Sequence, residues 1–386
     1  MQIMLRTLVV VGVLFSPEVA TPGPEGSGVL PSIQEADFPG SFPLAGTDIR
    51  LKIGGFVRLD IIHDFSAMGS TDSFDPSTIP TDGTKGENTR VHARGTRLNL
   101  DTRGPSTAGI LRAFVEGDFY GSGNSFRLRH GFGEIKGLLA GQTWTTFMDD
   151  EAIPPTLDSE EPRTMIFHRL GVLRWTQQLN EHSLVSFALE DAGGTISTPP
   201  SSSGSTETPW PNVVGRGRVN DTWGHAQVTG FLGSVRYRDD SEPADSILLW
   251  GLSASGKIHT TKKNEMIFQA AYGEGLGQFR GGAVAALSTS GEFQAIPNRS
   301  VTYSFLHRWS NALSSHAIVN HGWNETLDGQ ASTALEATWY GALNTVWSFA
   351  DRATIGAEWL YGQREDRDGA RGHNNRFLIA TTFVIS

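Results

Sequence analysis

The sequence contains no cysteine and only six lysines, against 25 arginines. The absence of thiols suits a chain that crosses an oxidising compartment, where stray thiols mispair, and it excludes any cysteine-based site. Long apolar runs are also missing: the longest is Leu8–Phe15, and the mean hydropathy is -0.24. Because a transmembrane helix needs about 20 apolar residues, a bundle of such helices is excluded. A transmembrane barrel is not excluded, since only every second residue of its strands faces lipid.

Catalytic and cofactor motifs are missing as well. The chain has no HExxH, no phosphate-binding loop and no GxGxxG, and its 11 histidines do not show metal-ligand spacing. We therefore expect no catalytic residues, no cofactor and no metal. The net charge of -10 argues against nucleic acid as a partner. The basic residues are mostly arginine, which is always charged and binds carboxylates through a planar fork.

The first 20 residues have the pattern of an export signal. Arg6 gives a positive start, Leu8–Phe15 is a short apolar core, Pro17 ends it, and Ala20 is a candidate last residue. Residues 21–46 are rich in Pro, Gly and Ser without heptads or strand pattern, which predicts a flexible leader. Residues 47–386 are then predicted to form a single β-barrel.

Along most of the chain the dominant pattern has a period of two, which is typical of strands with one apolar and one polar face. In residues 50–65, Val57 and Leu59 alternate with Arg58 and Asp60. A half-exposed sheet of a soluble protein has this pattern too. However, several charges on each polar face would be costly inside a two-sheet core, which favours a water-filled barrel. The same alternation recurs at 109–120, 246–259, 353–362 and 377–385.

Short and long connections alternate along the chain. Short periplasmic turns and long outer loops are typical of outer-membrane barrels, and the segments between them predict an all-β, antiparallel transmembrane barrel of about 16 strands. The expected turns lie near 104–107, 136–137, 179–181, 220–221, 260–263, 311–312 and 350–351. The expected longer connections are 66–89, 121–125, 148–162, 193–212, 239–245, 275–298, 323–332 and 364–373.

Aromatic residues fall within these strands, often near their ends. Those are the levels at which a membrane barrel has its aromatic girdles, although each residue taken alone is better explained as part of a soluble core. The residues are Trp144, Phe147, Trp175, Trp223, Trp250, Tyr303, Trp309, Trp347, Trp359 and Tyr361.

Several stretches of the sequence resemble the DcaP-like family of outer-membrane porins. They are DFPGSFPLAG at 37–46 with LKIGGFVRLD at 51–60, RLRHGFGE at 127–134, AGQTWTTFMD at 140–149, GEGLGQF at 273–279, and EWLYGQRE at 358–365 with NRF at 375–377. The matches run across nearly all of residues 37–383. The resemblance implies a homotrimeric barrel in the Gram-negative outer membrane and dicarboxylic acids as solutes.

Two features depart from that family's pattern. Members can carry an N-terminal coiled coil, and residues 21–46 show no heptads. Outer-membrane proteins usually end in an aromatic residue that the assembly machinery recognises, whereas this chain ends at Ser386. Either Phe383 takes that role with a short overhang, or recognition is weaker than usual.

One connection is predicted to fold into the lumen and narrow it. Residues 148–162 follow the fifth expected strand, are stiffened by Pro154 and Pro155, and contain no basic residue. The alternative for an acidic run is a solvated surface loop. The expected acidic residues of this constriction loop are Asp149, Asp150, Glu151, Asp158, Glu160 and Glu161.

Arginines on the polar strand faces are expected to point into the lumen, because a lipid-facing arginine costs about 2–4 kcal/mol near the midplane. Opposite an acidic loop they would create a transverse field that draws anions along the arginine wall. We therefore predict a water-filled channel for small hydrophilic solutes with a preference for anions such as dicarboxylate-like organic acids. Arg94 is out of phase with Arg97, so no face is assigned to it. The expected pore-lining residues are Arg58, Arg97, Arg112, Arg127, Arg129 and Arg174.

Two other interpretations remain open at this stage. One is a secreted or surface β-rich binding or structural protein. The other is a barrel-type outer-membrane hydrolase, which would need a Ser/His/acid set at one rim, and none stands out. For the porin, the expected partners are outer-membrane lipid and lipopolysaccharide, two further copies of the chain, and small anionic solutes.

Overall fold

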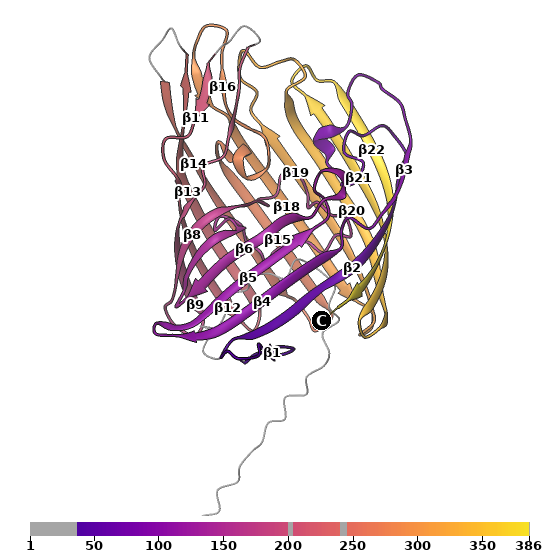
Figure 1. Ribbon diagram of the computed structural model, residues 1–386. Helices are drawn as coiled ribbons and strands as arrows, with labels where there is room; N and C mark the ends of the chain where they lie inside the picture. The colour runs from indigo at the N-terminus through magenta and orange to yellow at the C-terminus, as the bar shows by residue number, and fades with distance from the viewer. Residues whose placement is uncertain (1–36, 200–203, 240–244, 386) are drawn as a thin grey trace, which may run out of the picture.

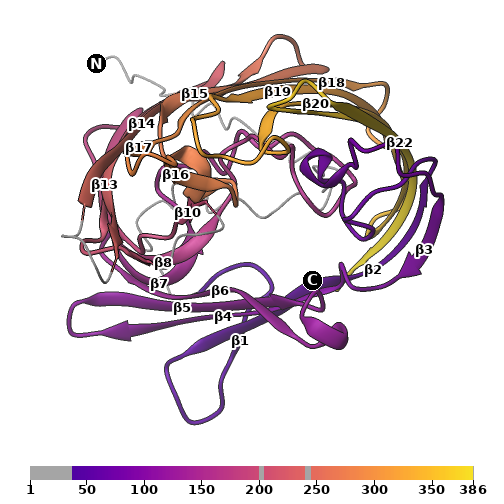
Figure 2. The same ribbon diagram turned by 90° about the horizontal axis from the view of Figure 1, so that it is seen from above.

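The computed structural model describes residues 37–199, 204–239 and 245–385. Sixteen antiparallel barrel strands follow one another in chain order, and the barrel closes where the last strand pairs with the first (Figures 1 and 2). The predicted all-β barrel and its strand count are confirmed. The strands are Arg50–Asp64 (β2), Asn88–His92 with Arg97–Ser106 (β3 and β4, one barrel strand in two pieces), Gly109–Asp118 (β5), Arg127–Ile135 (β6), Leu138–Trp144 (β7), Arg169–Gln178 (β8), Ser183–Glu190 (β9), Asn212–Asp221 (β12), Gly224–Arg238 (β13), Asp245–His259 (β14), Asn264–Glu274 (β15), Pro297–Arg308 (β18), Leu313–Asn324 (β19), Leu335–Ala350 (β20), Ala353–Asp366 (β21) and Arg371–Val384 (β22).

Side chains alternate between two faces along each barrel strand, and the apolar face is the outer one. In β2, Val57 and Leu59 are 49% and 44% exposed, whereas Arg58 and Asp60 are 8% and 2% exposed. A soluble sheet would bury its apolar face and expose its charges. The reverse arrangement suits lipid on the outside and polar groups on the inside, and it argues against the soluble alternative.

Short turns join the strands at one end of the barrel and longer loops at the other (Figure 1). The turn between β6 and β7 shows why two residues suffice. Lys136 and Gly137 have φ of 47° and 79°, and a tight hairpin needs left-handed backbone at both positions. The predicted alternation of turns and loops is confirmed. Residues 200–203 and 240–244 of two expected loops lie outside the described residues.

Short strands lie at both ends of the barrel, and 3-10 turns lie within its loops. At the turn end, Phe42–Pro43 (β1) pairs with the start of β2. At the loop end, Ser205–Glu207 (β11) extends the sheet beside β13, and three 3-10 turns occur within loops. A separate three-stranded sheet joins two loops inside the ring of strands (Figure 2). Its strands are Thr195–Ser197 (β10), Ala283–Leu287 (β16) and Phe293–Ala295 (β17), and the 3-10 turns are Pro76–Thr78 (η1), Ser122–Asn124 (η2) and Leu276–Phe279 (η3).

Residues 37–46 of the expected leader lie against the turn end of the barrel. Asp37 forms an ion pair with Arg50 at 2.9 Å, and the Arg103 guanidinium lies 3.9 Å from the centre of the Phe38 ring. The expected export signal at residues 1–20 lies outside the described residues. Among the residues that are described, no helix is long and apolar enough to span a membrane.

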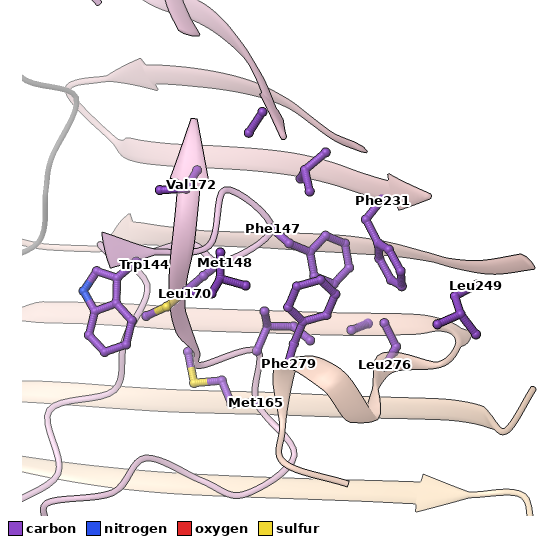
Figure 3. Packing of buried hydrophobic residues seen from close by; sticks show 14 of the residues in the cluster. Trp144, Phe147, Met148, Met165, Leu170, Val172, Phe231, Leu249, Leu276 and Phe279 are labelled. Atoms are coloured by element: carbon purple, nitrogen blue, oxygen red, sulfur yellow. The ribbon is translucent and has the colours of Figure 1, made fainter. Parts of the chain in front are cut away.

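One sector of the barrel interior is filled with apolar side chains. Phe147, Phe231 and Phe279 come from a loop, a strand and η3, and their rings lie 4.9–5.2 Å apart (Figure 3). A second cluster packs Phe74 and Leu157, from two loops, against Tyr340 and neighbouring residues of β19–β22. The sequence pattern did not predict these two clusters, because a period of two gives the face of a strand residue but not what a loop packs against.

Two residues assigned to the aromatic girdles do not lie there. Trp144 and Phe147 are 2% and 1% exposed and belong to the apolar cluster inside the barrel. Trp144 is the last residue of β7, and its ring packs 4.6 Å from that of Phe167, whereas Phe147 lies in the loop beyond the strand. The other eight girdle residues lie on barrel strands or at their turns.

Candidate functional site in the barrel interior

The connection between β7 and β8, residues 145–168, binds inward-facing side chains around the barrel, and we call it the central loop. Near its start, Glu190 of β9 accepts a hydrogen bond from the Thr146 N–H at 2.5 Å. Near its end, the Ile166 N–H donates to Gln269 of β15 at 2.8 Å. Since β7 and β15 are far apart in the barrel order, the loop reaches away from its own strands (Figure 2).

The middle of the central loop is held by a buried carboxylate of β21. Glu358 is 1% exposed and accepts hydrogen bonds from the N–H groups of Leu157 and Asp158 at 3.0 and 2.9 Å. It also accepts from the Thr156 hydroxyl at 2.9 Å and from the Asn344 amide at 2.9 Å. Two backbone donors on one carboxylate fix the position of the chain there, because both would otherwise be unsatisfied.

The first acidic residues of the central loop are neutralised by basic residues of β12 and β13. Asp149 accepts from His225 at 2.9 Å and from the Ser255 hydroxyl at 2.8 Å, and it lies 3.6 Å from Arg218. Glu151 forms an ion pair with Arg218. Burial alone would raise the pKa of Asp149, but the His225 hydrogen bond and the nearby Arg218 hold that pKa below its ordinary value. This carboxylate therefore stays charged and bound to the wall.

Asp158 is bound on a different part of the wall. It forms an ion pair with Arg376 of β22 at 3.4 Å, and Arg376 pairs with Asp64 of β2 at 2.7 Å. The Phe74 N–H of the loop between β2 and β3 donates to Asp158 at 2.8 Å. Burial raises the pKa of Asp158 in spite of Arg376. Asp158 thus joins two loops to the barrel and is not available to a solute.

Glu160 and Glu161 differ from Asp149, Glu151 and Asp158, because neither has an ion pair within 4 Å among the described residues. Glu160 interacts electrostatically with Arg127 and Arg169, and Glu161 interacts with Arg97. Burial and neighbouring carboxylates raise the pKa of both, that of Glu161 well above its ordinary value. These two carboxylates thus lie within electrostatic range of arginines on β4, β6 and β8 without forming an ion pair with them among the described residues. Asp150, the remaining acidic residue of the loop, is buried.

Four of the six expected pore-lining arginines form ion pairs with carboxylates of the same or an adjacent strand. A paired arginine contributes little net charge to the lumen, because its partner cancels most of the field. Arg127 is the most exposed of the four. The pairs are Arg58 with Asp60 at 2.7 Å, Arg112 with Asp101 at 2.9 Å, Arg127 with Asp118 at 2.7 Å, and Arg129 with Glu116 at 2.9 Å and with Asp118 at 3.0 Å.

The other two expected arginines, Arg97 and Arg174, have no acidic group within 4 Å among the described residues. Arg97 points inward, because it shares one strand face with the buried Asn99 and Asp101, whereas Leu98 and Leu100 on the other face are 42% and 47% exposed. Arg174 is 7% exposed on the inner face of β8. Arg97 and Arg174 therefore supply net positive charge to the barrel interior.

Arg169, the first residue of β8, is a further arginine without an ion pair, like Arg97. It was not among the expected site residues. It interacts electrostatically with Arg97, Arg127 and Arg129, and it has no ion pair within 4 Å in the described chain. Its guanidinium lies 4.4 Å from the Trp144 ring, and that of Arg97 lies 5.4 Å from the Phe56 ring. The aromatic faces hold both guanidinium groups in place. The Arg169 Nη1 atom is buried without a hydrogen-bond partner among the described residues.

Other basic residues that bind the central loop were also missed from the sequence. Arg218 and Arg376 alternate with apolar or outward residues, so the period of two contained the signal that would have assigned them to the inner face. Arg169 had no such signal, because it stands where a loop becomes a strand. The described residues contain no group of His, Asp or Glu side chains that could hold a metal ion.

The closed antiparallel barrel of 16 strands, its lipid-compatible outer face and its charged interior define an outer-membrane porin. The family model of the DcaP outer membrane protein matches residues 33–383, and the chain belongs to that family. The resemblance read from the sequence is confirmed, and the protein is located in the outer membrane. No curated protein sequence matches the chain.

Solved structures show the same fold. The outer membrane channel DcaP of Acinetobacter baumannii superposes with a TM-score of 0.79 at 19% identity, covering 90% of this chain and 100% of that one. The anion-selective porin of Comamonas acidovorans gives a TM-score of 0.56 at 9% identity, covering 87% and 100%. The trimer form of OmpT from Vibrio cholerae gives a TM-score of 0.53 at 12% identity, covering 87% and 99%.

Proposed function

We propose that this porin prefers small organic anions, and that Arg97 and Arg169 select them. The observation that carries the proposal is the pair of guanidinium groups that lie over aromatic rings but have no acidic group within 4 Å in the described chain. Their N–H donors are free to bind the carboxylate of a passing solute through the planar fork of arginine.

The central loop supplies the opposite charge and serves as the constriction loop. Glu160 and Glu161 lie within electrostatic range of these arginines but form no ion pair within 4 Å with them in the described chain. Separated charges of opposite sign create a transverse field in the gap, whereas a contact pair would largely cancel. An anion then follows the arginine side, and the carboxylates repel it from the loop side.

Dicarboxylate-like acids are the proposed solutes. Two carboxylates could be bound in succession by Arg97 and Arg169 and then by Arg174 nearer the turn end of β8. The solved anion-selective porin with the same fold shows that this barrel type accommodates such selectivity in another protein. Passive diffusion needs no catalytic group, and we propose that the protein is not an enzyme.

The wall formed by β4 to β9 is proposed to lie at the centre of a homotrimer. Its strands have 7 to 10 residues, whereas β20 to β22 have 14 to 16. Outward Leu98, Leu111 and Val115 form an exposed apolar surface there. Strands this short do not have to span the full bilayer if neighbouring copies of the chain cover this part of the barrel. OmpT, which shares the fold, has a trimer form. The mass of the protein extracted in mild detergent tests the assembly.

Flux into proteoliposomes tests the solute preference. We expect radiolabelled succinate to enter several times faster than putrescine, which has a similar size and the opposite charge. Removal of the arginines should abolish that difference without closing the channel. Equal fluxes, or faster putrescine entry, would refute the anion preference and leave the porin assignment intact.

A further inference from the structure

An arginine stands on the lipid-facing side of β18, close to the loop end of the barrel. Arg299 is exposed and shares the outer face with Val301 and Tyr303, which are 48% and 41% exposed. The neighbours of Arg299 in the sheet are Tyr272 on one side and Trp323 on the other. Glu274 lies two residues beyond Tyr272 on the same outer face of β15, but it forms no ion pair within 4 Å with Arg299 among the described residues. The charge of Arg299 therefore requires an explanation.

Aromatic rings beside Arg299 form a rigid platform. The Arg299 guanidinium lies 5.0 Å from the centre of the Trp323 ring. His321 packs 3.7 Å from Trp323 and stacks on Trp339 at 3.7 Å with an angle of 8°. Its Nδ1 atom is 2.7 Å from the Thr338 carbonyl oxygen, which fixes the imidazole. One face of the guanidinium is therefore covered by a ring, while the Arg299 side chain remains exposed on the barrel surface.

The height of Arg299 places it at the level of lipid headgroups. Ten residues separate it from the turn at Trp309, which at the usual rise and tilt of barrel strands corresponds to roughly 25 Å. The apolar band of such barrels is about 25 Å tall. Because the long loops of these barrels face the outside, Arg299 stands at the border between the apolar band and the outer leaflet's polar surface.

Other outward arginines near this end already have partners. Arg238 pairs with Glu207 at 2.6 Å, and Arg371 pairs with Glu365 at 2.8 Å. Arg299 has no acidic group within 4 Å in the part of the chain that the structure describes. A cation that faces lipid needs an anion from outside the chain, and phosphate is the anion found at this depth.

We infer that Arg299, on the platform of Trp323, His321 and Trp339, binds a phosphate of the phosphorylated glycolipid of the outer leaflet, the lipid A part of lipopolysaccharide. The guanidinium fork binds two phosphate oxygens, and the acyl chains lie on the apolar surface at Val301. This site is on the outside of the barrel and does not depend on the proposed solute preference.

Native mass spectrometry of the purified protein with added lipid A tests the site. Wild type should bind bisphosphorylated lipid A in preference to enzymatically dephosphorylated lipid A. Arg299→Ala should lower the bound fraction about fivefold, to the level of the dephosphorylated lipid. Arg299→Lys keeps the positive charge but lacks the planar fork of arginine. Its bound fraction of lipid A should lie between those of wild type and Arg299→Ala.

Arg238→Ala is the matched control, because it also removes an outward arginine near the loop end, but one that is paired with Glu207. It should leave lipid A binding unchanged. Heat-modifiable migration on gels shows that each variant is folded. Wild-type binding by Arg299→Ala, or an equal loss in Arg238→Ala, would overturn the inference. Single-channel conductance of Arg299→Ala should match wild type, which separates this site from the channel.

Discussion

Glu358 on β21 accepts a hydrogen bond from the backbone N–H of Asp158 at 2.9 Å, although 200 residues separate them in the chain. The same carboxylate accepts from the neighbouring Leu157 N–H, and Glu190 accepts from Thr146 N–H at the other end of the segment. Two buried carboxylates on β9 and β21 therefore fix the central loop by its backbone. Its position does not depend on the ion pairs of its acidic side chains alone.

Replacement of Glu358 by alanine should loosen the central loop. The variant leaves two backbone N–H groups unsatisfied, which costs about 1–3 kcal/mol for each buried donor. Open-channel current noise should increase, and trypsin should cut at Arg163 faster than in wild type. The control is Glu365→Ala on the same strand, which pairs outward with Arg371. Unchanged noise and proteolysis in Glu358→Ala would contradict the anchoring role.

Neutralising Arg97 and Arg169 should shift selectivity toward cations. Even at the dielectric constant of water, one charge about 6 Å from a solute contributes about 0.7 kcal/mol, which is roughly a threefold change in partition. Each charge favours chloride and disfavours potassium by this factor, so the double variant Arg97→Gln with Arg169→Gln should lower the chloride-to-potassium permeability ratio by roughly a hundredfold. Reversal potentials in a salt gradient give the ratio.

The control for this pair is Arg371→Gln, which removes one outward arginine that has an acidic partner. Its permeability ratio should equal that of wild type. A double variant that keeps the wild-type ratio would show that Arg97 and Arg169 do not select the ion.

Anion preference should increase as the pH falls from neutral. The pKa values of Glu160 and Glu161 are raised by burial, so both carboxylates take up protons at a higher pH than an ordinary glutamate. The arginines keep their charge throughout, and the gap becomes more positive. Permeability ratios measured in steps from pH 7 to pH 4 test this. The variant Glu160→Gln with Glu161→Gln should lose most of the pH dependence. If its permeability ratio still changed with pH as in wild type, the pH dependence would have to come from other groups.

Removal of the Phe279 ring should destabilise the apolar sector inside the barrel. Phe279 is fully buried between Phe147 and Phe231, and a buried Phe→Ala change costs about 3–5 kcal/mol. Limited proteolysis should become faster at Arg280, while the barrel strands stay protected. Phe305→Ala on the lipid face is the comparison, since it leaves no cavity in this sector. Equal protection of Arg280 in both variants would mean that the cluster does not hold the loop.

The period of two and the spacing of turns were sufficient to predict the strands. Val57 and Leu59 against Arg58 and Asp60 already gave the two faces of β2, and the apolar face proved to be the outer one. The strand pattern alone predicted a barrel, and the resemblance to the DcaP-like family was needed to predict which family of barrels the chain belongs to. Arg94 could not be assigned from its phase, and it binds Asp72 and the carbonyl groups of Tyr120 and Gly121 at the loop end of the barrel.

The interior was harder to predict, because a repeat of two says which face a residue lies on but not what a loop packs against. Phe147 and Phe279 lie in segments without periodicity, so nothing in the sequence paired them with Phe231. Likewise, the acidic residues of the central loop look equivalent in sequence. Asp149 and Asp158 are bound to the walls, whereas Glu160 and Glu161 lie within electrostatic range of arginines.

The zero-current potential of the wild-type channel in a tenfold potassium chloride gradient tests the anion preference most directly. We expect a potential of the sign set by chloride, which reverses in the Arg97→Gln, Arg169→Gln double variant. A wild-type potential of the sign set by potassium would contradict the anion preference.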